Sequence, residues 1–170
     1  MKTLENCKKT VLTLIGLLVA IVIYAQDRPS PAATASGEIN GATITVNYSS
    51  PAVKDRVIWG GLVPYDKVWR AGANEATTFE TSKAIKVEGK DLPAGKYGFF
   101  TIPGQGEWTI IFNTVSDQWG SSSYDQSKDA LRVSVKPVKI DQMNERLTYA
   151  VSGSSLALRW EKLEVPVSIK

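Results

Sequence analysis

The sequence of 170 residues contains no histidine and a single cysteine, Cys7. Without histidine it has neither a Ser-His-Asp nor a Cys-His nucleophile, and it lacks the usual ligands of zinc and blue-copper centres. One cysteine also excludes an intramolecular disulfide framework. We therefore expect no metal site and no cofactor, and a fold held together by its core and its sheet hydrogen bonds.

A basic surplus that would attract nucleic acid is also missing. The formal net charge is +3, but Lys2, Lys8 and Lys9 belong to residues 1–25, together with Glu5. The rest of the chain is close to neutral and has no cluster of lysine and arginine that would neutralise a row of phosphates. We expect no nucleic-acid partner.

The chain has no apolar run long enough to cross a bilayer, which takes about 20 residues. The uncharged stretch Val11–Ala25 instead follows three lysines, as in a secretory signal. Residues 1–25 are predicted to be a signal peptide cleaved after Ala25, with an uncleaved anchor as the alternative. We expect export to the periplasm first and full secretion second, with no membrane span after cleavage.

Patterns of helical period are absent over any length that would form a layer. After an extended leader at 26–33, which contains Pro29 and Pro31, short alternating runs follow at the spacing typical of sandwiches and barrels. Residues 34–170 therefore predict one all-β domain, a single antiparallel β-sandwich of roughly eight to ten strands. One helical turn is expected within 123–130.

Turn signals separate the expected strands. Asn40-Gly41 is the strongest, because a type I′ hairpin turn needs positive φ at both central residues. The alternation through 155–160 starts again at Leu163, which predicts two strands, with Pro166 at an edge or a bulge. The expected strands cover residues 35–39, 43–48, 77–81, 84–88, 96–102, 107–113, 131–136, 146–151, 155–160 and 163–169.

Two segments do not alternate cleanly. Val57–Thr78 is rich in tryptophan and glycine, and Asn113–Tyr124 carries Asp-Gln-Trp-Gly before three serines. Together with Leu92–Pro103 and Glu107–Asn113, they resemble the domain-of-unknown-function family 2911 (DUF2911), over nearly all of the mature chain. That family consists of exported bacterial proteins, largely from Gram-negative envelopes. The resemblance implies a compact β domain behind a signal peptide, and it supplies no reaction and no catalytic residues.

The five tryptophans divide by their setting in the sequence. Trp108 and Trp160 fall inside alternating runs and are expected in the core. Trp59 and Trp69 have two interpretations, core or lid packing and a platform on which a sugar or another flat ligand stacks. Trp119 lies between Gln118 and Gly120 in a predicted loop, so it is the best platform candidate.

Arg70, Asn74 and Glu75 lie close together in the glycine-rich segment and also allow two interpretations. Arg70 and Glu75 can form an ion pair that braces the loop. Alternatively, the Arg70 guanidinium is a fork for a carboxylate or phosphate, with Asn74 orienting the ligand. Asn74 can equally satisfy backbone groups in a turn.

Our leading expectation is a non-catalytic envelope module that binds a glycan, a peptide or an envelope protein through loops. The alternatives are a purely structural envelope protein, in which the tryptophan-rich loop is a packed plug, and a hydrolase of envelope polysaccharide. The hydrolase would use Glu75 and Asp117 as acid and base, a chemistry that needs no histidine. The expected binding residues are Trp59, Trp69, Arg70, Asn74, Glu75, Gln118, Trp119 and Tyr124.

Overall fold

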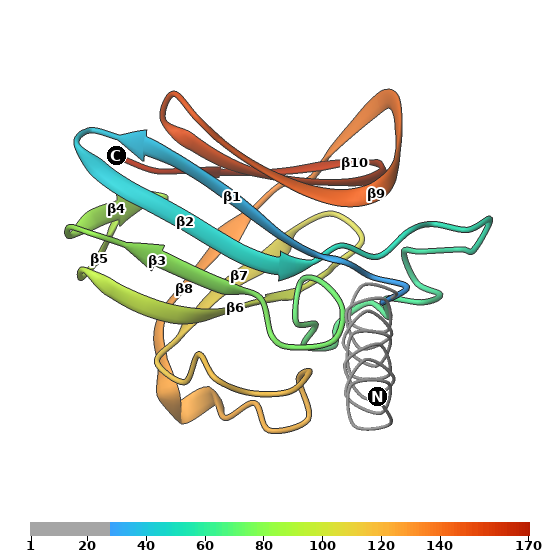
Figure 1. Ribbon diagram of the computed structural model, residues 1–170, viewed down its shortest axis with the longest axis horizontal. Helices are drawn as coiled ribbons and strands as arrows, with labels where there is room; N and C mark the ends of the chain where they lie inside the picture. Colours follow the sequence, from blue (N-terminus) through green and yellow to red (C-terminus); the bar gives the residue numbers. More distant parts are fainter. Residues whose placement is uncertain (1–27) are drawn as a thin grey trace, which may run out of the picture.

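The computed structural model describes residues 28–170 (Figure 1). The predicted signal peptide at 1–25 and the first two residues of the expected leader lie outside the described residues. Within the described part the chain forms ten strands, six in one sheet and two in each of two smaller sheets. No helix among residues 28–170 has the length and the apolar character needed to cross a membrane.

The six-stranded sheet is antiparallel, with the strand order β1-β2-β3-β6-β7-β8. The predicted hairpin at Asn40-Gly41 is present, with φ of 50° and 75° at its two central residues. It pairs Ile39 with Ala42 and so fixes the register of the first two strands. The strands are β1 (Ala32–Ile39), β2 (Ala42–Ser49), β3 (Thr78–Thr81), β6 (Gly95–Ile102), β7 (Trp108–Asn113) and β8 (Asp129–Val135).

A second layer packs over one face of this sheet (Figure 1). It consists of the hairpin of β9 (Val138–Ser152) and β10 (Ser155–Ser168) and of the hairpin of β4 (Ile85–Val87) and β5 (Lys90–Leu92). The C-terminus joins the two hairpins, because Lys86 N donates to Lys170 O at 2.7 Å and Lys170 N donates to Lys86 O at 2.8 Å. The predicted all-β sandwich is confirmed.

The sequence prediction of two strands over 155–169 is wrong, because β10 is one continuous strand with a bulge. Glu161 lies at this bulge with φ of 55°, between two shifts in the register of β10 against β9. A bulge inserts a residue, so the inward-facing side chains change from even to odd positions within the same strand. Two further strand regions were not predicted, β5 and the first half of β9, which have little apolar alternation.

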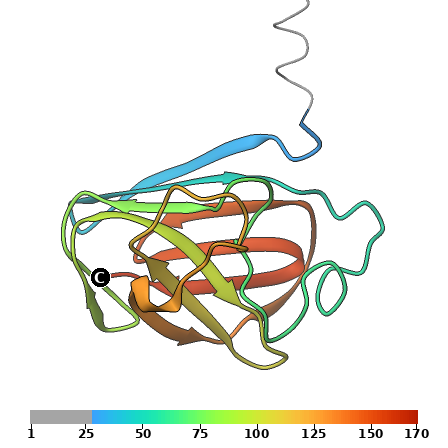
Figure 2. The same ribbon diagram turned by 90° about the horizontal axis from the view of Figure 1, so that it is seen from below.

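The main core lies between the two layers, and a smaller one lies on the outer face of the sheet. Phe99 faces the main core, whereas its neighbour Phe100 points to the outer face, as alternation in a strand requires. There the segment 114–128 covers it, with the Tyr124 ring 5.3 Å from that of Phe100. Figure 2 shows this segment in front of the sheet. It ends in a 3₁₀ turn at Gln126–Lys128, within the predicted helical turn.

Candidate functional site

The two non-alternating segments meet in the structure. Ala76 N donates to Gln118 O at 3.0 Å, and Gly120 N donates to Asn74 O at 3.1 Å. Between these bonds Glu75 and Trp119 form an antiparallel bridge. Residues 74–76 of the first segment are therefore fixed against Gln118–Gly120, although more than forty positions separate them in the sequence.

The loop that carries Arg70 is anchored to the core through the carbonyl oxygen of Ala71. This oxygen accepts hydrogen bonds from the hydroxyl groups of Tyr149, at 2.7 Å, and Thr77, at 3.0 Å. Tyr149 is buried, and burial raises the pKa of its hydroxyl group well above the usual value. The hydroxyl group therefore remains a donor over the physiological range, and the loop backbone is held in one conformation.

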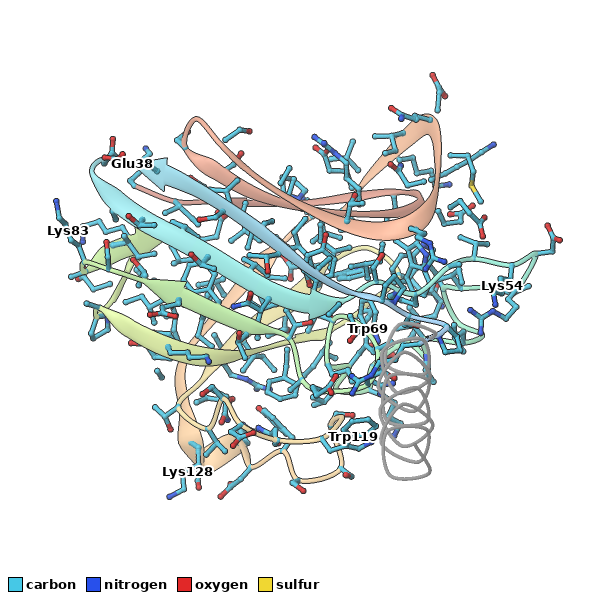
Figure 3. The ribbon with its side chains drawn as sticks, in the orientation of Figure 1. Glu38, Lys54, Trp69, Lys83, Trp119 and Lys128 are labelled. Atoms are coloured by element: carbon cyan, nitrogen blue, oxygen red, sulfur yellow. The ribbon has the colours of Figure 1, made fainter. Side chains whose placement is uncertain are left out.

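Trp119 projects from the rim of the fold (Figure 3), and 64% of its surface is exposed. Its backbone is fixed on both sides by the hydrogen bonds of Gln118 and Gly120. The Gln118 amide also holds the loop, since Nε2 donates to the carbonyl oxygen of Val115 at 2.9 Å. A large indole on a fixed backbone offers a flat contact surface at little cost in conformational entropy.

Arg70 is half-buried, and its side chain has no hydrogen bond and no ion pair within residues 28–170. Its Nε atom is buried without a partner, and burial lowers the pKa of the guanidinium group. The group lies against the Gln118–Gly120 loop, because a Cβ atom added to Gly120 would be 3.8 Å from an Arg70 nitrogen. Burial of a cationic nitrogen without a hydrogen-bond partner has a cost in free energy.

The other arginines of the described region all have partners. Arg28, Arg132 and Arg159 each pair with a carboxylate. Arg56 and Arg146 donate to backbone carbonyl oxygens. Arg70 is thus the exception among the arginines of residues 28–170.

The ion pair between Arg70 and Glu75, one of the two interpretations of the sequence, is not formed. Glu75 Oε1 instead accepts from Arg28 at 2.7 Å, and this hydrogen bond lowers the pKa of the Glu75 carboxyl group. Asn74 Nδ2 donates to the carbonyl oxygen of Ser30 at 3.2 Å, so Asn74 satisfies backbone. Both side chains fasten the leader to the loop. Asp117, the second candidate of the hydrolase interpretation, is exposed.

Tyr124 belongs to a polar network beneath the loop. Its hydroxyl group donates to Asp129 Oδ2 at 2.6 Å, while Arg132 Nε lies 3.0 Å from the same oxygen. Asn113 Nδ2 donates to Asp129 Oδ1 at 2.8 Å. Burial and the Asp129 carboxylate raise the pKa of Tyr124 to about 12. This arrangement holds the loop on the sheet and keeps the Tyr124 hydroxyl group hydrogen-bonded to Asp129.

Trp59 and Trp69 lie away from Trp119, in an aromatic cluster with Trp108 and Trp160. The ring centroids of Trp59 and Trp69 are 5.9 Å apart, and both rings lie within 6.5 Å of Trp108 and Trp160. Trp69 Nε1 donates to the carbonyl oxygen of Gly72 at 3.2 Å. Trp59 and Trp69 are both partly buried against the core, and Trp59 also lines a pocket.

Sequence reasoning missed Arg28, which belongs to the expected leader and is bound to Glu75. It also missed Ser49, whose hydroxyl group lies 3.4 Å from Glu75 Oε2. Neither has a local signal, because Arg28 is 47 positions from its partner.

Comparison with known proteins gave one result. Residues 30–169 match the model of a family described as "Protein of unknown function (DUF2911)". Neither the curated proteins nor the solved structures include a match.

Proposed function

Since this chain belongs to the DUF2911 family, we propose a function from its own geometry: a non-catalytic binding module for an anionic ligand. The ligand surface consists of Arg70 and the loop Gln118–Gly120, which we call the Arg70–Trp119 surface. The protein would act after export, in the periplasm, on a component of the cell envelope.

The observation that carries this proposal is the unpartnered guanidinium group of Arg70. A planar guanidinium group matches a carboxylate or phosphate through two parallel hydrogen bonds. Binding such a group would compensate for the desolvation that the fold imposes on Arg70. The apo protein therefore holds a donor in place before the ligand arrives, which reduces the ordering cost of binding.

Trp119 favours a glycan as the rest of the ligand. The C–H face of a sugar ring is apolar and weakly positive, so it stacks on the negative face of an indole. An acidic sugar offers the ring and the carboxylate together. An acidic peptide would satisfy Arg70 but would use the Trp119 ring less fully.

The alternatives fit the site less well. A general acid in glycoside hydrolysis needs a raised pKa, whereas the Arg28 hydrogen bond lowers that of Glu75. A packed plug accounts for Trp59 and Trp69, which pack against the core, but it leaves Trp119, which is 64% exposed, without a role.

The test is a calorimetric titration of the purified protein with acidic oligosaccharides, peptidoglycan fragments and acidic peptides. We expect saturable binding to an acidic glycan, which Arg70→Met and Trp119→Ala each weaken by about tenfold or more, since each removes a main contact. Arg70→Lys should retain part of the affinity. Lys83→Met, at the left end of the molecule and well separated from Trp119 (Figure 3), is the control and should bind normally. Unchanged affinity in both Arg70→Met and Trp119→Ala would contradict the proposal. Tighter binding of acidic peptides than of acidic glycans would mean that the ligand is a peptide and not a glycan.

A further inference from the structure

A pocket of about 470 Å³ is lined by Trp59 and Trp108 of the tryptophan cluster and by no residue of the Arg70–Trp119 surface. Its walls come from the segment 59–65, the turn between β6 and β7, the first residue of β7, the start of β9 and the middle of β10. The volume is within the range of pockets that hold small molecules in proteins, roughly 300–1,000 Å³. None of the residues expected from the sequence to bind ligand lies in it except Trp59.

The floor of the pocket is aromatic and rigid. Trp59 and Trp108 both line it, and their ring centroids are 4.9 Å apart in an edge-to-face arrangement. Trp108 is almost completely buried, so its position is fixed by the core. Tyr65 lies beside them over Gly60, where a Cβ atom would approach its ring to 2.8 Å. A glycine at this position therefore allows the Tyr65 ring to pack into the wall.

The β10 wall contains a strained residue. Glu161 has φ of 55°, in the left-handed region that side chains other than glycine and asparagine rarely adopt. Its carbonyl oxygen accepts from Asn144 Nδ2 at 3.3 Å, which stabilises the bulge. Bulges redirect side chains, and residues in unfavourable backbone conformations gather at binding sites. The register shifts of β9 against Glu161 and Leu163 bring Lys139 and Asp141 into the same pocket.

The charges around the pocket balance. Asp141 and Glu161 contribute two carboxylates, and Lys139 and Lys162 contribute two ammonium groups. A balanced rim gives no net attraction for an anion or a cation, but it offers many hydrogen-bond acceptors and donors. A ligand that fits has a flat apolar face for the aromatic floor and hydroxyl groups that both donate and accept at its edge. A neutral saccharide ring has these properties.

We infer that this pocket, the Trp59 pocket, is a second binding site that takes a neutral saccharide. The partly exposed rings of Trp59 and Tyr65 stack against the C–H face of the saccharide, and the Asp141 and Glu161 carboxylates accept from its hydroxyl groups. A zwitterionic dipeptide also matches a rim of mixed charge, but it has no ring face for the indole and phenol groups. This inference goes beyond the proposed function, because it rests on different residues.

The test is an NMR titration of the full protein that follows the indole N–H signals. The probes are cellobiose, maltose and N,N′-diacetylchitobiose, with alanyl-alanine as the zwitterionic comparison. We expect at least one disaccharide to shift the Trp59 signal saturably at concentrations up to about 10 mM, which covers millimolar affinities, while the Trp119 signal stays unchanged.

Variants assign the site. Asp141→Asn and Glu161→Gln keep side-chain shape and should each weaken disaccharide binding by about tenfold, because a charged hydrogen-bond acceptor is lost. Glu80→Gln, an exposed glutamate on β3 outside the pocket, is the matched control and should bind normally. Asp141 is exposed, so its variant tests the site even if Glu161→Gln perturbs the bulge.

Two results would overturn the inference. The first is the absence of any saturable shift of Trp59 with the three disaccharides, and the second is binding of the dipeptide alone. Arg70→Met separates this inference from the proposed function, since it should leave disaccharide binding at the Trp59 pocket unchanged. Loss of binding in Arg70→Met with retention in Asp141→Asn would place the saccharide at the Arg70–Trp119 surface instead and would also reject the Trp59 pocket.

Discussion

The charged side chains of this fold differ in how completely they are satisfied. Asp129 is buried and receives hydrogen bonds from Tyr124 and Asn113 as well as an ion pair with Arg132. Arg70 is half-buried and has neither within residues 28–170. This difference fits the proposed role of Arg70, because binding residues often trade stability for function.

Replacing Arg70 by methionine should therefore leave the protein as stable as before, or make it more stable. Methionine fills a similar volume without a charge to desolvate, so we expect the free energy of unfolding to be unchanged or raised by up to about 1 kcal/mol. Urea unfolding measures this value, with Arg70→Lys as the control that keeps the charge. A loss greater than about 1 kcal/mol would mean that Arg70 supports the fold.

Because of Tyr124, the stability of the protein depends on pH in the alkaline range. Its pKa rises from 10.0 to about 12 in the folded state, because of burial and the hydrogen bond to Asp129. The folded state thus holds the phenolic proton more tightly than the unfolded chain does. This contribution to stability is complete below about pH 10 and is lost as the pH rises towards 12. Between these pH values, urea unfolding should show a smaller decline in the free energy of unfolding for Tyr124→Phe than for the natural protein. Equal declines in the two proteins would contradict this prediction.

Some side-chain positions could be predicted from the sequence, whereas some side-chain contacts could not. Trp108 and Trp160 were predicted in the core from their place in alternating runs, and both are buried. The partner of Glu75 was not predictable, because Arg28 reaches it only through the folding of the leader against β2 and the Arg70 loop. Proximity in the sequence suggested Arg70 as the ion-pair partner of Glu75, whereas the partner in the folded protein is Arg28, which lies 47 positions away.

At the scale of the strands, alternation predicted most of the six-stranded sheet. It failed where the pattern changes phase, at Glu161, and where strands are short or polar, as in β5. A phase change has two causes, a turn or a bulge, and a single sequence does not distinguish them. The first half of β9 has little apolar alternation, since much of it faces solvent. Because this part of β9 lines the Trp59 pocket, the pocket could not be predicted from the sequence.

The loop over the outer face depends on a close approach at Gly98 of β6. A Cβ atom there would lie 2.5 Å from the carbonyl oxygen of Val115, so Gly98→Ala must displace the 114–128 segment. We expect a loss of about 1–3 kcal/mol in the free energy of unfolding, as for other overpacked sites, together with weaker ligand binding at Trp119.

Gly106→Ala is the matched control for this change, because a Cβ atom at Gly106 meets nothing within 4 Å and its φ is not positive. Chemical unfolding of the two variants gives the comparison. Equal stability of both would show that the loop adapts to the added methyl group without cost.

At the scale of the whole molecule, the second layer is completed by the last residues of the chain. Ile169 is fully buried and forms a bridge with Val87 of β4, and Lys170 pairs with Lys86 through two backbone hydrogen bonds. The β4–β5 hairpin is joined to β10 by these contacts and by the hydrogen bond from Glu88 N to Ser168 O at 3.0 Å. The two layers then enclose one continuous core.

Deleting Ile169 and Lys170 should open this junction. The loss of a buried isoleucine side chain and of the paired backbone groups is expected to lower the free energy of unfolding by about 2–5 kcal/mol. Deleting Lys170 alone keeps the buried side chain and should cost less. Thermal unfolding of both truncated proteins measures the difference, and an equal effect of the two deletions would mean that Ile169 contributes little.

The tryptophan cluster also has an optical consequence. Indole rings whose centroids lie 4.9–6.5 Å apart couple their electronic transitions, so absorbed energy is shared among Trp59, Trp69, Trp108 and Trp160. Trp119 stands in water on a separate loop. We therefore expect the fluorescence of the folded protein to combine emission from the coupled rings with a red-shifted emission from Trp119, which would report on its candidate ligand surface without any added dye.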